Sequence, residues 1–450
     1  MNIRLLKKSG YVSRLILIFP GWSCDASLYS GLDLNGWDIG VVENYESPSF
    51  PLDSLNCYST IYLFAWSLGV AFASTVDFRD RITAAYALNG TLHPVDDMLG
   101  IPCDIFMATA ENLSPRNLSK FRRRMAGDRE TFQRLFNKDF SADECASLKE
   151  ILLSVASRKD VFPCYRLPWK RAYLSSDDAI FPFDNMKRSW ENENVEIVEL
   201  EAPHYLDMRK IIGHTIPDTE KVSERFSSSV KTYERRAVVQ KRMARTLCDM
   251  TGLSGFSKCR NILEIGQGTG VLTNLYLPLI NPEHIDFVDI SDSYPEGIGF
   301  NHTFHKEDAE EWMERNDRHF DLIISSATLQ WFVNLPRFIF NCASSLEKGG
   351  IFSFSTFLPG NLRELDDYRP TPLRYVSEKE IVDILHRYFP DVEHQSEYIT
   401  VDFDSSADLL RHLKETGVAG SSPGNRSAAL KLRKLKSLTF HCGYFLARKS

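Results

Sequence analysis

Ser67 is the first residue whose surroundings point to chemistry. It follows the apolar run 61–66 and precedes a helix-compatible run, with the small residues Ala65 and Gly69 on its two sides. A tight strand-to-helix turn brings backbone close to both flanks of such a serine, so small residues are needed there, and the turn exposes the hydroxyl. The pattern predicts a nucleophilic serine. The alternative is an ordinary serine at a strand end.

Two further residues would complete a serine-based catalytic site. Asp178 and His204 each follow a predicted strand, and they come after Ser67 in the chain. His204 would take the proton of Ser67, and Asp178 would orient the imidazole and stabilise its cation. Asp177 is the rival acid, although the context Asp-Ala-Ile-Phe-Pro that begins at Asp178 is more typical of hydrolases. A solvated loop histidine is the alternative interpretation of His204.

The backbone near Ser67 offers candidate oxyanion donors. The backbone N–H groups of Trp22, after the first predicted strand, and of Leu68 are suited to that role. The order serine, acid, histidine is that of an α/β-hydrolase fold. Over about residues 10–212 the chain resembles the short esterase family that cleaves pimeloyl-[acyl-carrier protein] methyl ester in biotin synthesis. The segments that carry the resemblance are Pro20–Trp22, Ala65–Gly69, Asn89–Pro94, Gly100–Pro102 and Lys120–Met125.

This resemblance implies that residues 111–165 form a small helical cap over the active site. Basic residues outnumber acidic ones in the stretch, and Arg122, Arg123 and Arg124 are adjacent. They would dock an acidic acyl carrier protein that presents the acyl methyl ester. The alternative is a solvated helical face without a partner.

A second chemical pattern lies in the other half of the chain. The strand predicted at 261–265 contains Glu264 and runs into Gly266, Gly268 and Gly270. Glycine lets the backbone approach a bound nucleotide. A valine stands where a dinucleotide fingerprint has its third glycine. The acid and glycine spacing instead resembles class I S-adenosylmethionine methyltransferases, which have a Rossmann-like fold.

Three more residues fit the S-adenosylmethionine site that this resemblance implies. Asp289 ends a predicted strand, where a carboxylate is suited to accept hydrogen bonds from both ribose hydroxyls. Asp308 and Ala309 stand where the family binds adenine. We expect no metal, because the chain has neither a His-Glu-x-x-His helix nor a Cys-x-x-Cys pair.

Residues 218–445 more specifically resemble the malonyl-[acyl-carrier protein] O-methyltransferase family, which starts pimelate synthesis for biotin. A carboxylate needs little base to accept a methyl group, so we expect positioning to dominate this catalysis. Tyr233 and Arg363 are candidates for holding the malonyl carboxylate, with a surface helix or loop as the alternative for each. The resemblance is carried by Phe226, Tyr233, Gln240–Ala244, Leu329–Trp331 and Phe354–Glu364.

Both sites require parallel strands whose ends meet at one edge of a sheet. Short apolar runs separated by helix-forming stretches predict two α/β units. Helix breakers at 213–218 divide the chain into domains 1–214 and 215–450, with a helical lead-in at 221–245 and a surface loop at 417–426. The predicted strands lie at 15–19, 61–65, 84–88, 105–108, 171–174 and 195–200, then at 261–265, 285–289, 322–326 and 351–355.

The composition excludes several classes of protein. The 450 residues include 53 basic and 60 acidic ones, a net charge of −7 that argues against nucleic-acid binding through overall charge. The N-terminal apolar run 15–19 is too short for a signal peptide or a membrane span. Nine scattered cysteines favour a reducing compartment, and hence the cytoplasm.

Together these patterns predict a bifunctional enzyme of biotin synthesis. Its second half would methylate malonyl-[acyl-carrier protein], and its first half would hydrolyse pimeloyl-[acyl-carrier protein] methyl ester. The cap would select the longer acyl chain, because cleavage of the malonyl ester on the same chain would be futile. Two alternatives stay open: the same activities on another carrier or a small carboxylic acid, or an inactive hydrolase fold that docks the carrier protein.

Overall fold

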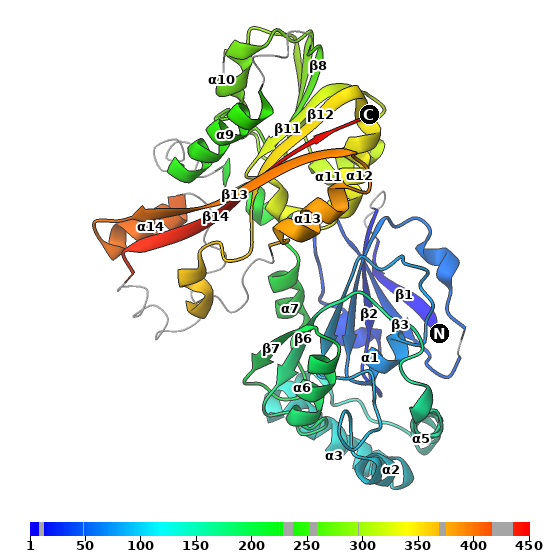
Figure 1. The fold of residues 1–450 in the computed structure, drawn as a ribbon. Coiled ribbons are helices and arrows are strands. Elements are labelled where there is room, and N and C mark those ends of the chain that lie inside the picture. The colour runs from blue at the N-terminus through cyan, green and yellow to red at the C-terminus, as the bar shows by residue number, and fades with distance from the viewer. Residues whose placement is uncertain are drawn as a thin grey trace. The chain divides into compact units, whose positions relative to one another are not determined.

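The computed structural model describes residues 1–8, 13–47, 49–224, 226–227, 237–252, 259–295, 297–368, 375–415 and 435–450 (Figure 1). The chain divides into two compact units, Met1–Ile211 and Ile212–Ser450. The division lies three residues before the boundary predicted from the sequence. In the described parts of the chain, no helix has the length and apolar character that crossing a bilayer requires.

The first unit is built on a seven-stranded sheet with the order β1-β3-β2-β4-β5-β6-β7. Every pairing is parallel except that of β1 with β3. The central strands are buried on both faces, which explains their continuous apolar runs. The strands are β1 (Asn2–Lys7), β2 (Arg14–Phe19), β3 (Asp38–Glu43), β4 (Thr60–Trp66), β5 (Ala84–Leu88), β6 (Trp169–Ser175) and β7 (Glu196–Leu200).

Four α-helices lie between β5 and β6. Three of them, within residues 115–157, fall in the cap predicted at 111–165, and the fourth, at residues 103–111, precedes it and is counted with the cap below. Ser141 and Glu144 make a capping box that begins α5, and Gly127, with a φ of +80°, ends α3. The other helices pack along the sheet or follow β7. The cap helices are α2 (Cys103–Glu111), α3 (Pro115–Ala126), α4 (Arg129–Leu135) and α5 (Ala142–Ser157), and the others are α1 (Leu68–Ala73), α6 (Phe183–Asn192) and α7 (Met208–Thr215).

The structure corrects one predicted strand of this unit. Residues 105–108 lie inside α2, with Phe106 and Ala110 buried on one face. A four-residue apolar run fits a buried strand and a buried helix turn equally well. The i, i+4 spacing of the two buried residues and the preceding Pro102 agree with the helix.

The second unit has its own seven-stranded sheet, in the order β10-β9-β8-β11-β12-β14-β13. Its strands are parallel except β14, which runs antiparallel to both β12 and β13. Figure 1 shows the long β13–β14 pair extending past the other strands. The strands are β8 (Asn261–Ile265), β9 (His284–Asp289), β10 (His302–Lys306), β11 (Phe320–Ser326), β12 (Leu346–Phe357), β13 (Asp391–Asp402) and β14 (Ser437–Arg448).

Both faces of this second sheet are buried. Ile262 and Leu322 point into one apolar cluster, and their neighbours Leu263 and Ile323 point into the other. Parallel strands covered on both faces place their carboxyl ends, and the loops that follow them, at a common edge. The covering helices are α9 (Val238–Thr251), α10 (Thr273–Tyr276), α11 (Ala309–Arg315), α12 (Leu335–Ser345), α13 (Glu378–Leu385) and α14 (Ser406–Glu415).

The predicted helical lead-in at 221–245 is present in part. Residues 219–224 are helical, and α9 covers the stretch from Val238 onward. The surface loop predicted at 417–426 lies outside the described residues, as does Tyr233.

Candidate active sites

Ser67 lies on a strained turn between β4 and α1. Its φ of +58° is in the left-handed region, which costs energy for a residue with a side chain. A Cβ on Gly69 would come within 2.2 Å of the carbonyl oxygen of Phe19, and one on Gly90 within 2.2 Å of that of Ser67. Gly69 is therefore required by close backbone approach, the reason the sequence suggested for it. Gly90 follows β5, the strand beside β4, and must also lack a side chain because of its approach to the Ser67 carbonyl.

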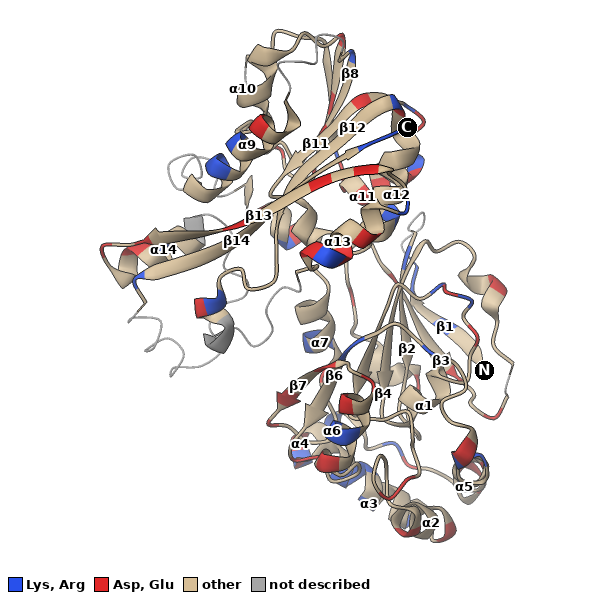
Figure 2. Ribbon diagram, in the orientation of Figure 1, with Lys and Arg blue, Asp and Glu red and all other residues tan. Residues whose placement is uncertain are grey.

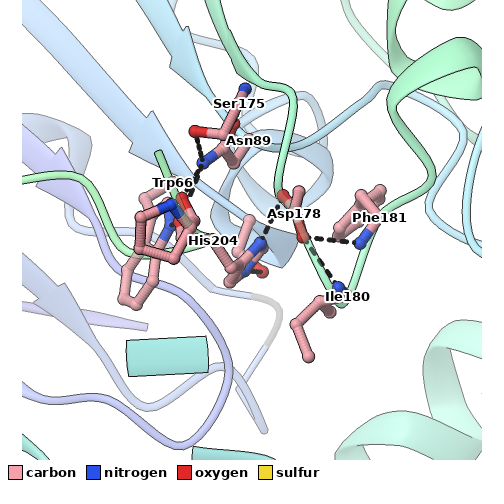
Figure 3. A network of polar contacts seen from close by, with 9 residues as sticks. Trp66, Asn89, Ser175, Asp178, Ile180, Phe181 and His204 are labelled. Atoms are coloured by element: carbon pink, nitrogen blue, oxygen red, sulfur yellow. Dashed lines mark hydrogen bonds and ion pairs between the residues drawn. The ribbon is translucent and has the colours of Figure 1, made fainter. Parts of the chain in front are cut away.

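The structure brings Ser67, His204 and Asp178 together. Nε2 of His204 lies 2.9 Å from the hydroxyl of Ser67, and Nδ1 lies 2.7 Å from Oδ2 of Asp178. The side chains of His204 and Asp178 are fully buried. Oδ1 of Asp178 accepts the backbone N–H groups of Ile180 at 2.7 Å and Phe181 at 2.9 Å (Figure 3). The carboxylate is thus fixed against the imidazole.

The rival acid lies elsewhere. Asp177 is an exposed residue, whereas the carboxylate of Asp178 is buried against His204. A carboxylate orients an imidazole only within hydrogen-bond reach of it. The geometry therefore favours Asp178 for that role.

Asn89 links the loop that carries His204 to the ends of β5 and β6. Its buried amide donates to Oγ of Ser175 at 2.8 Å and to the carbonyl oxygens of Pro203 at 3.2 Å and His204 at 2.8 Å. Its Oδ1 accepts the backbone N–H of Ser175 at 2.8 Å. Nε1 of Trp66 donates to the same His204 carbonyl at 2.9 Å (Figure 3). No local pattern in the sequence marks Asn89 for this role, because its partners are 86 to 115 positions away in the chain.

A pocket opens above Ser67, and Trp22 and Leu68 line it beside the serine. Both predicted oxyanion residues are therefore at the site. The indole Nε1 of Trp22 donates to the carbonyl oxygen of Leu148 in α5 at 3.0 Å, which ties the loop after β2 to the cap. The rest of the pocket is mainly apolar and includes Ile105 and Leu152 from the cap.

The three adjacent cap arginines have different surroundings. Arg122 is only 5% exposed, stacks on Phe136 and Phe140, and donates to a backbone carbonyl, so its predicted role in docking a partner is wrong. Its guanidinium packs against these two rings inside the cap, so Arg122 contributes to packing. Arg123 and Arg124 are exposed, and Arg124 lines the pocket of Ser67. Figure 2 shows basic positions on α3.

In the second unit the glycine loop follows β8. Gly266, Gly268 and Gly270 all have positive φ, from +52° to +85°. A Cβ on Gly266 would lie 2.1 Å from Oγ1 of Thr328, while a Cβ on Gly268 would meet nothing within 4 Å. Gly266 therefore allows the loop after β11 to pack closely, whereas Gly268 leaves open space.

Asp289 holds this loop from the end of β9. Its Oδ2 accepts the backbone N–H of Gly268 at 2.9 Å, and its Oδ1 accepts the backbone N–H and the hydroxyl of Ser291 at 2.7 and 2.8 Å. Burial raises the pKa of Asp289 despite these bonds. The residue lines one cavity together with Gly266, Gly268, Asp308 and Ala309. Asp308 also caps the N-terminus of α11.

Glu264 and Gly270 are predicted cofactor residues that do not line the cavity. The fully buried carboxylate of Glu264 accepts hydrogen bonds from Thr273 and Tyr276, at 2.8 and 2.6 Å through Oε2. Burial raises its pKa to about 7. A buried carboxylate must find such donors, and here they come from the helix after the loop. Glu264 therefore anchors α10, the helix after the glycine loop, to the end of β8.

The cavity fits S-adenosylmethionine in the chemistry of its walls. It combines a buried carboxylate, a glycine that leaves open space, and apolar residues such as Val288 and Ile290. Among the described residues, Oε1 of Gln267 and Oγ1 of Thr269 are buried without a partner. A ligand with hydroxyl and amino groups would satisfy these atoms.

Arg363, one of the two residues predicted to hold the substrate carboxylate, does not line the cavity. Its side chain is largely exposed and lies beside Glu364. Tyr233 lies outside the described residues. The cavity wall instead includes Phe226, Gln240 and Trp331, for which the sequence suggested a family resemblance but no role.

Comparison with known proteins assigns the two halves to two families. Residues 1–215 match the family described as pimeloyl-ACP methyl esterase BioG, and residues 234–419 match a methyltransferase domain family. The crystal structure of BioG from Haemophilus influenzae is 32% identical and covers 46% of this chain and 94% of that chain, with a TM-score of 0.41.

Relatives extend over both halves. A malonyl-[acyl-carrier protein] O-methyltransferase of Bacteroides fragilis is 30% identical over 465 residues, covering 96% of this chain and 92% of its own length. One of Chlorobium luteolum is 35% identical over 213 residues, covering 45% of this chain and 80% of its own. The predicted fold class is confirmed, an α/β-hydrolase fold followed by a class I methyltransferase fold, and the predicted cofactor, S-adenosylmethionine, is confirmed with it. The chain belongs to the malonyl-[acyl-carrier protein] O-methyltransferase family, with a BioG-type domain ahead of its methyltransferase domain.

Proposed function

We propose that the chain carries out two reactions of biotin synthesis. The second unit methylates the free carboxylate of malonyl-[acyl-carrier protein], and the first unit hydrolyses pimeloyl-[acyl-carrier protein] methyl ester. The observation that carries the esterase proposal is the buried chain of hydrogen bonds from Ser67 through His204 to Asp178. An inert docking module would not need this arrangement.

In the proposed hydrolysis, Oγ of Ser67 attacks the ester carbonyl while Nε2 of His204 takes its proton. Asp178 stabilises the imidazolium that forms. The backbone N–H groups of Trp22 and Leu68 donate to the oxyanion. His204 then gives the proton to the departing methoxide, which leaves as methanol. Water, activated by the same imidazole, hydrolyses the acyl-serine and frees the pimeloyl carboxylate.

In the methyltransferase unit, bound S-adenosylmethionine supplies an electrophilic methyl group. Asp289 and the glycine loop would hold the cofactor, and Asp308 and Ala309 would bind its adenine. The acceptor carboxylate is anionic near pH 7, so the residues of the chain have to position it rather than deprotonate it. This agrees with a cavity in which the described side chains include no general base of the histidine or lysine type.

We also propose that an acyl carrier protein docks on the cap through Arg123 and Arg124, in the cytoplasm. Arg124 lines the pocket of Ser67, so its guanidinium would meet the phosphate-bearing arm of a carrier protein that enters this pocket. All nine cysteines are free thiols, which suits a reducing compartment.

Assays on the purified full chain test both activities. Ser67→Ala should abolish release of methanol from pimeloyl-carrier methyl ester and leave methyl transfer to malonyl-carrier protein unchanged. A fluorophosphonate probe should label the wild-type chain and not this variant. Methanol release by Ser67→Ala at the wild-type rate would overturn the esterase proposal.

A further inference from the structure

The cavity of the second unit has two chemically different parts. One part is formed by the glycine loop and by Asp289 at the end of β9. The other is formed by Phe226, Gln240 and Trp331. In the sheet, β8 lies between β9 and β11. The glycine loop follows β8, Asp289 ends β9, and Trp331 is in the loop after β11. Asp289 and Trp331 therefore lie on opposite sides of the glycine loop. With the cofactor proposed at the glycine loop and Asp289, the aromatic part is left for the methyl acceptor.

Trp331 has an unused hydrogen-bond donor in this part of the cavity. Its Nε1 is buried and has no acceptor among the described residues. A buried N–H without a partner is costly, so such groups usually meet a ligand or water. The ring also packs edge-on against Phe226, with centroids 6.3 Å apart.

The loop before Trp331 is held in a single conformation. Ala327 has a φ of +55°, and its carbonyl oxygen accepts the side-chain amide of Gln330 at 2.6 Å. Oε1 of Gln330 in turn accepts the hydroxyl of Thr356 at 3.2 Å. The backbone strain and the two bonds fix the loop, so the indole is preorganised beside the cavity.

Gln240 is a second polar residue in this part of the cavity wall. It lies on the buried stripe of α9 and is 7% exposed. Its side-chain amide makes no hydrogen bond to any residue that the structure describes. Because Gln240 lines the cavity, a ligand bound there can replace the water around its amide. The buried N–H of Trp331 and the amide N–H groups of Gln240 can both donate to acceptor atoms of such a ligand.

We propose that Nε1 of Trp331 and the side-chain amide of Gln240 donate hydrogen bonds to the carboxylate of the methyl acceptor. This inference rests on the proposed methyl transfer and names the residues that bind its substrate. Both of these donors are neutral side chains that line the cavity. Neutral donors orient the carboxylate without an ion pair that would compete with its attack on the methyl group. They also bind a methyl ester more weakly than a carboxylate, which favours release of the product.

Three variants of the full chain test the proposal. Trp331→Phe keeps the ring against Phe226 and removes the N–H, and Gln240→Ala removes the amide. Each should raise KM for malonyl-carrier protein about tenfold with a smaller change in kcat. Gln240→Glu should be more damaging near pH 8 and should recover toward wild type as the pH falls and the introduced carboxyl is protonated. Trp312→Phe, which also lies in the second unit but not at the cavity, is the matched control.

Cofactor affinity, measured by calorimetry, shows whether the second unit of each variant is folded. Ester hydrolysis shows the same for the first unit. If Trp331→Phe lost cofactor affinity, the pH dependence of Gln240→Glu would decide the question. An unchanged KM in Trp331→Phe and Gln240→Ala, together with a wild-type pH profile in Gln240→Glu, would overturn the assignment of these two residues. It would leave the proposed methyl transfer standing. A wild-type chain that transfers no methyl group to malonyl-carrier protein would overturn the proposed function, and the inference with it.

Discussion

The side-chain amide of Asn89 donates to the backbone carbonyl oxygen of His204, 115 positions further along the chain, at 2.8 Å. Asn89 holds this bond from a left-handed conformation, with a φ of +43° and no exposed surface. It does not line the pocket of Ser67. Its contact is to the backbone of the histidine, so its effect on the reaction has to pass through the placement of the imidazole.

Removing this amide should therefore slow hydrolysis without weakening substrate binding. Asn89→Gly deletes the side chain without adding strain at a positive φ. We expect kcat for ester hydrolysis to fall about tenfold or more, with KM and methyl transfer unchanged. Ser175→Ala, which removes one contact of Asn89 and leaves its bonds to the histidine loop, is the control. Equal losses in the two variants would contradict a positioning role.

The two neighbouring aspartates should differ strongly. Asp178→Asn keeps the shape of the side chain but loses the charge that stabilises the imidazolium, so kcat should fall by about 10²–10⁴. Asp177 is exposed. Its Asn variant should stay within about twofold of wild type in steady-state hydrolysis assays. If Asp177→Asn were the more damaging change, the acid would be assigned to the wrong residue.

Gly268→Val should abolish binding of S-adenosylmethionine and leave ester hydrolysis intact. The substitution adds a branched side chain to the cavity wall at a φ of +52°, where strain alone costs about 1–2 kcal/mol. Gly252 is the matched control, because it has a φ of +63° and open space but does not line the cavity. Calorimetry should show retained affinity for Gly252→Val. Retained affinity in Gly268→Val would refute the role of the loop.

Glu264 should make the stability of the second unit depend on pH. Burial raises its pKa from 4.5 to about 7. The folded unit then binds a proton more tightly than the unfolded chain, so this contribution to stability is present below pH 4.5 and is lost as the pH rises to about 7. The loss is about 3 kcal/mol at most.

Glu264→Gln removes this titration. The free energy of opening of β8, measured by hydrogen exchange from pH 4.5 to 8, should decrease with pH in the wild type relative to the variant. Parallel pH profiles would show that the carboxyl titrates normally in the folded protein. Comparing the two proteins cancels the contributions of all other carboxylates.

The esterase should prefer pimeloyl over malonyl methyl ester by at least about tenfold in kcat/KM. The pimeloyl chain is about four methylenes longer than the malonyl chain. Burying them against the apolar pocket, at about 0.8 kcal/mol per methylene, stabilises the bound ester by up to about 3 kcal/mol. Ile105 lines this pocket and is 57% exposed, so Ile105→Ser should reduce the preference at little cost in stability. Leu153→Ser, at an exposed cap position away from the pocket, should not. Equal rates on both carrier-protein esters would refute selection by length.

Local patterns in the sequence predicted the parts of both sites that depend on local geometry. The turn at Ser67 and the glycine loop need particular residues at fixed spacing, and each is visible within about ten positions. The contacts of Asn89 join segments 86 to 115 positions apart and leave no local pattern. Only the assembled sheet shows them.

The cap arginines illustrate a second limit. Successive residues of a helix point about 100° apart, so adjacent arginines must face different surroundings. Counting charge along the chain treats Arg122 and Arg124 alike, although the first is buried and the second lines a pocket. Which residue turns inward depends on the phenylalanines that tertiary packing brings beside it.

The hydrogen bond from the indole of Trp22 to the carbonyl oxygen of Leu148 joins the cap to the proposed oxyanion loop. Trp22 supplies one of the proposed oxyanion N–H groups, and its indole is anchored to α5. Any displacement of α5 would therefore move the loop whose backbone N–H is proposed to donate to the oxyanion. In the proposed hydrolysis the cap is therefore part of the catalytic structure and not only a selector of chain length, so removing it should lower turnover of every ester, short or long.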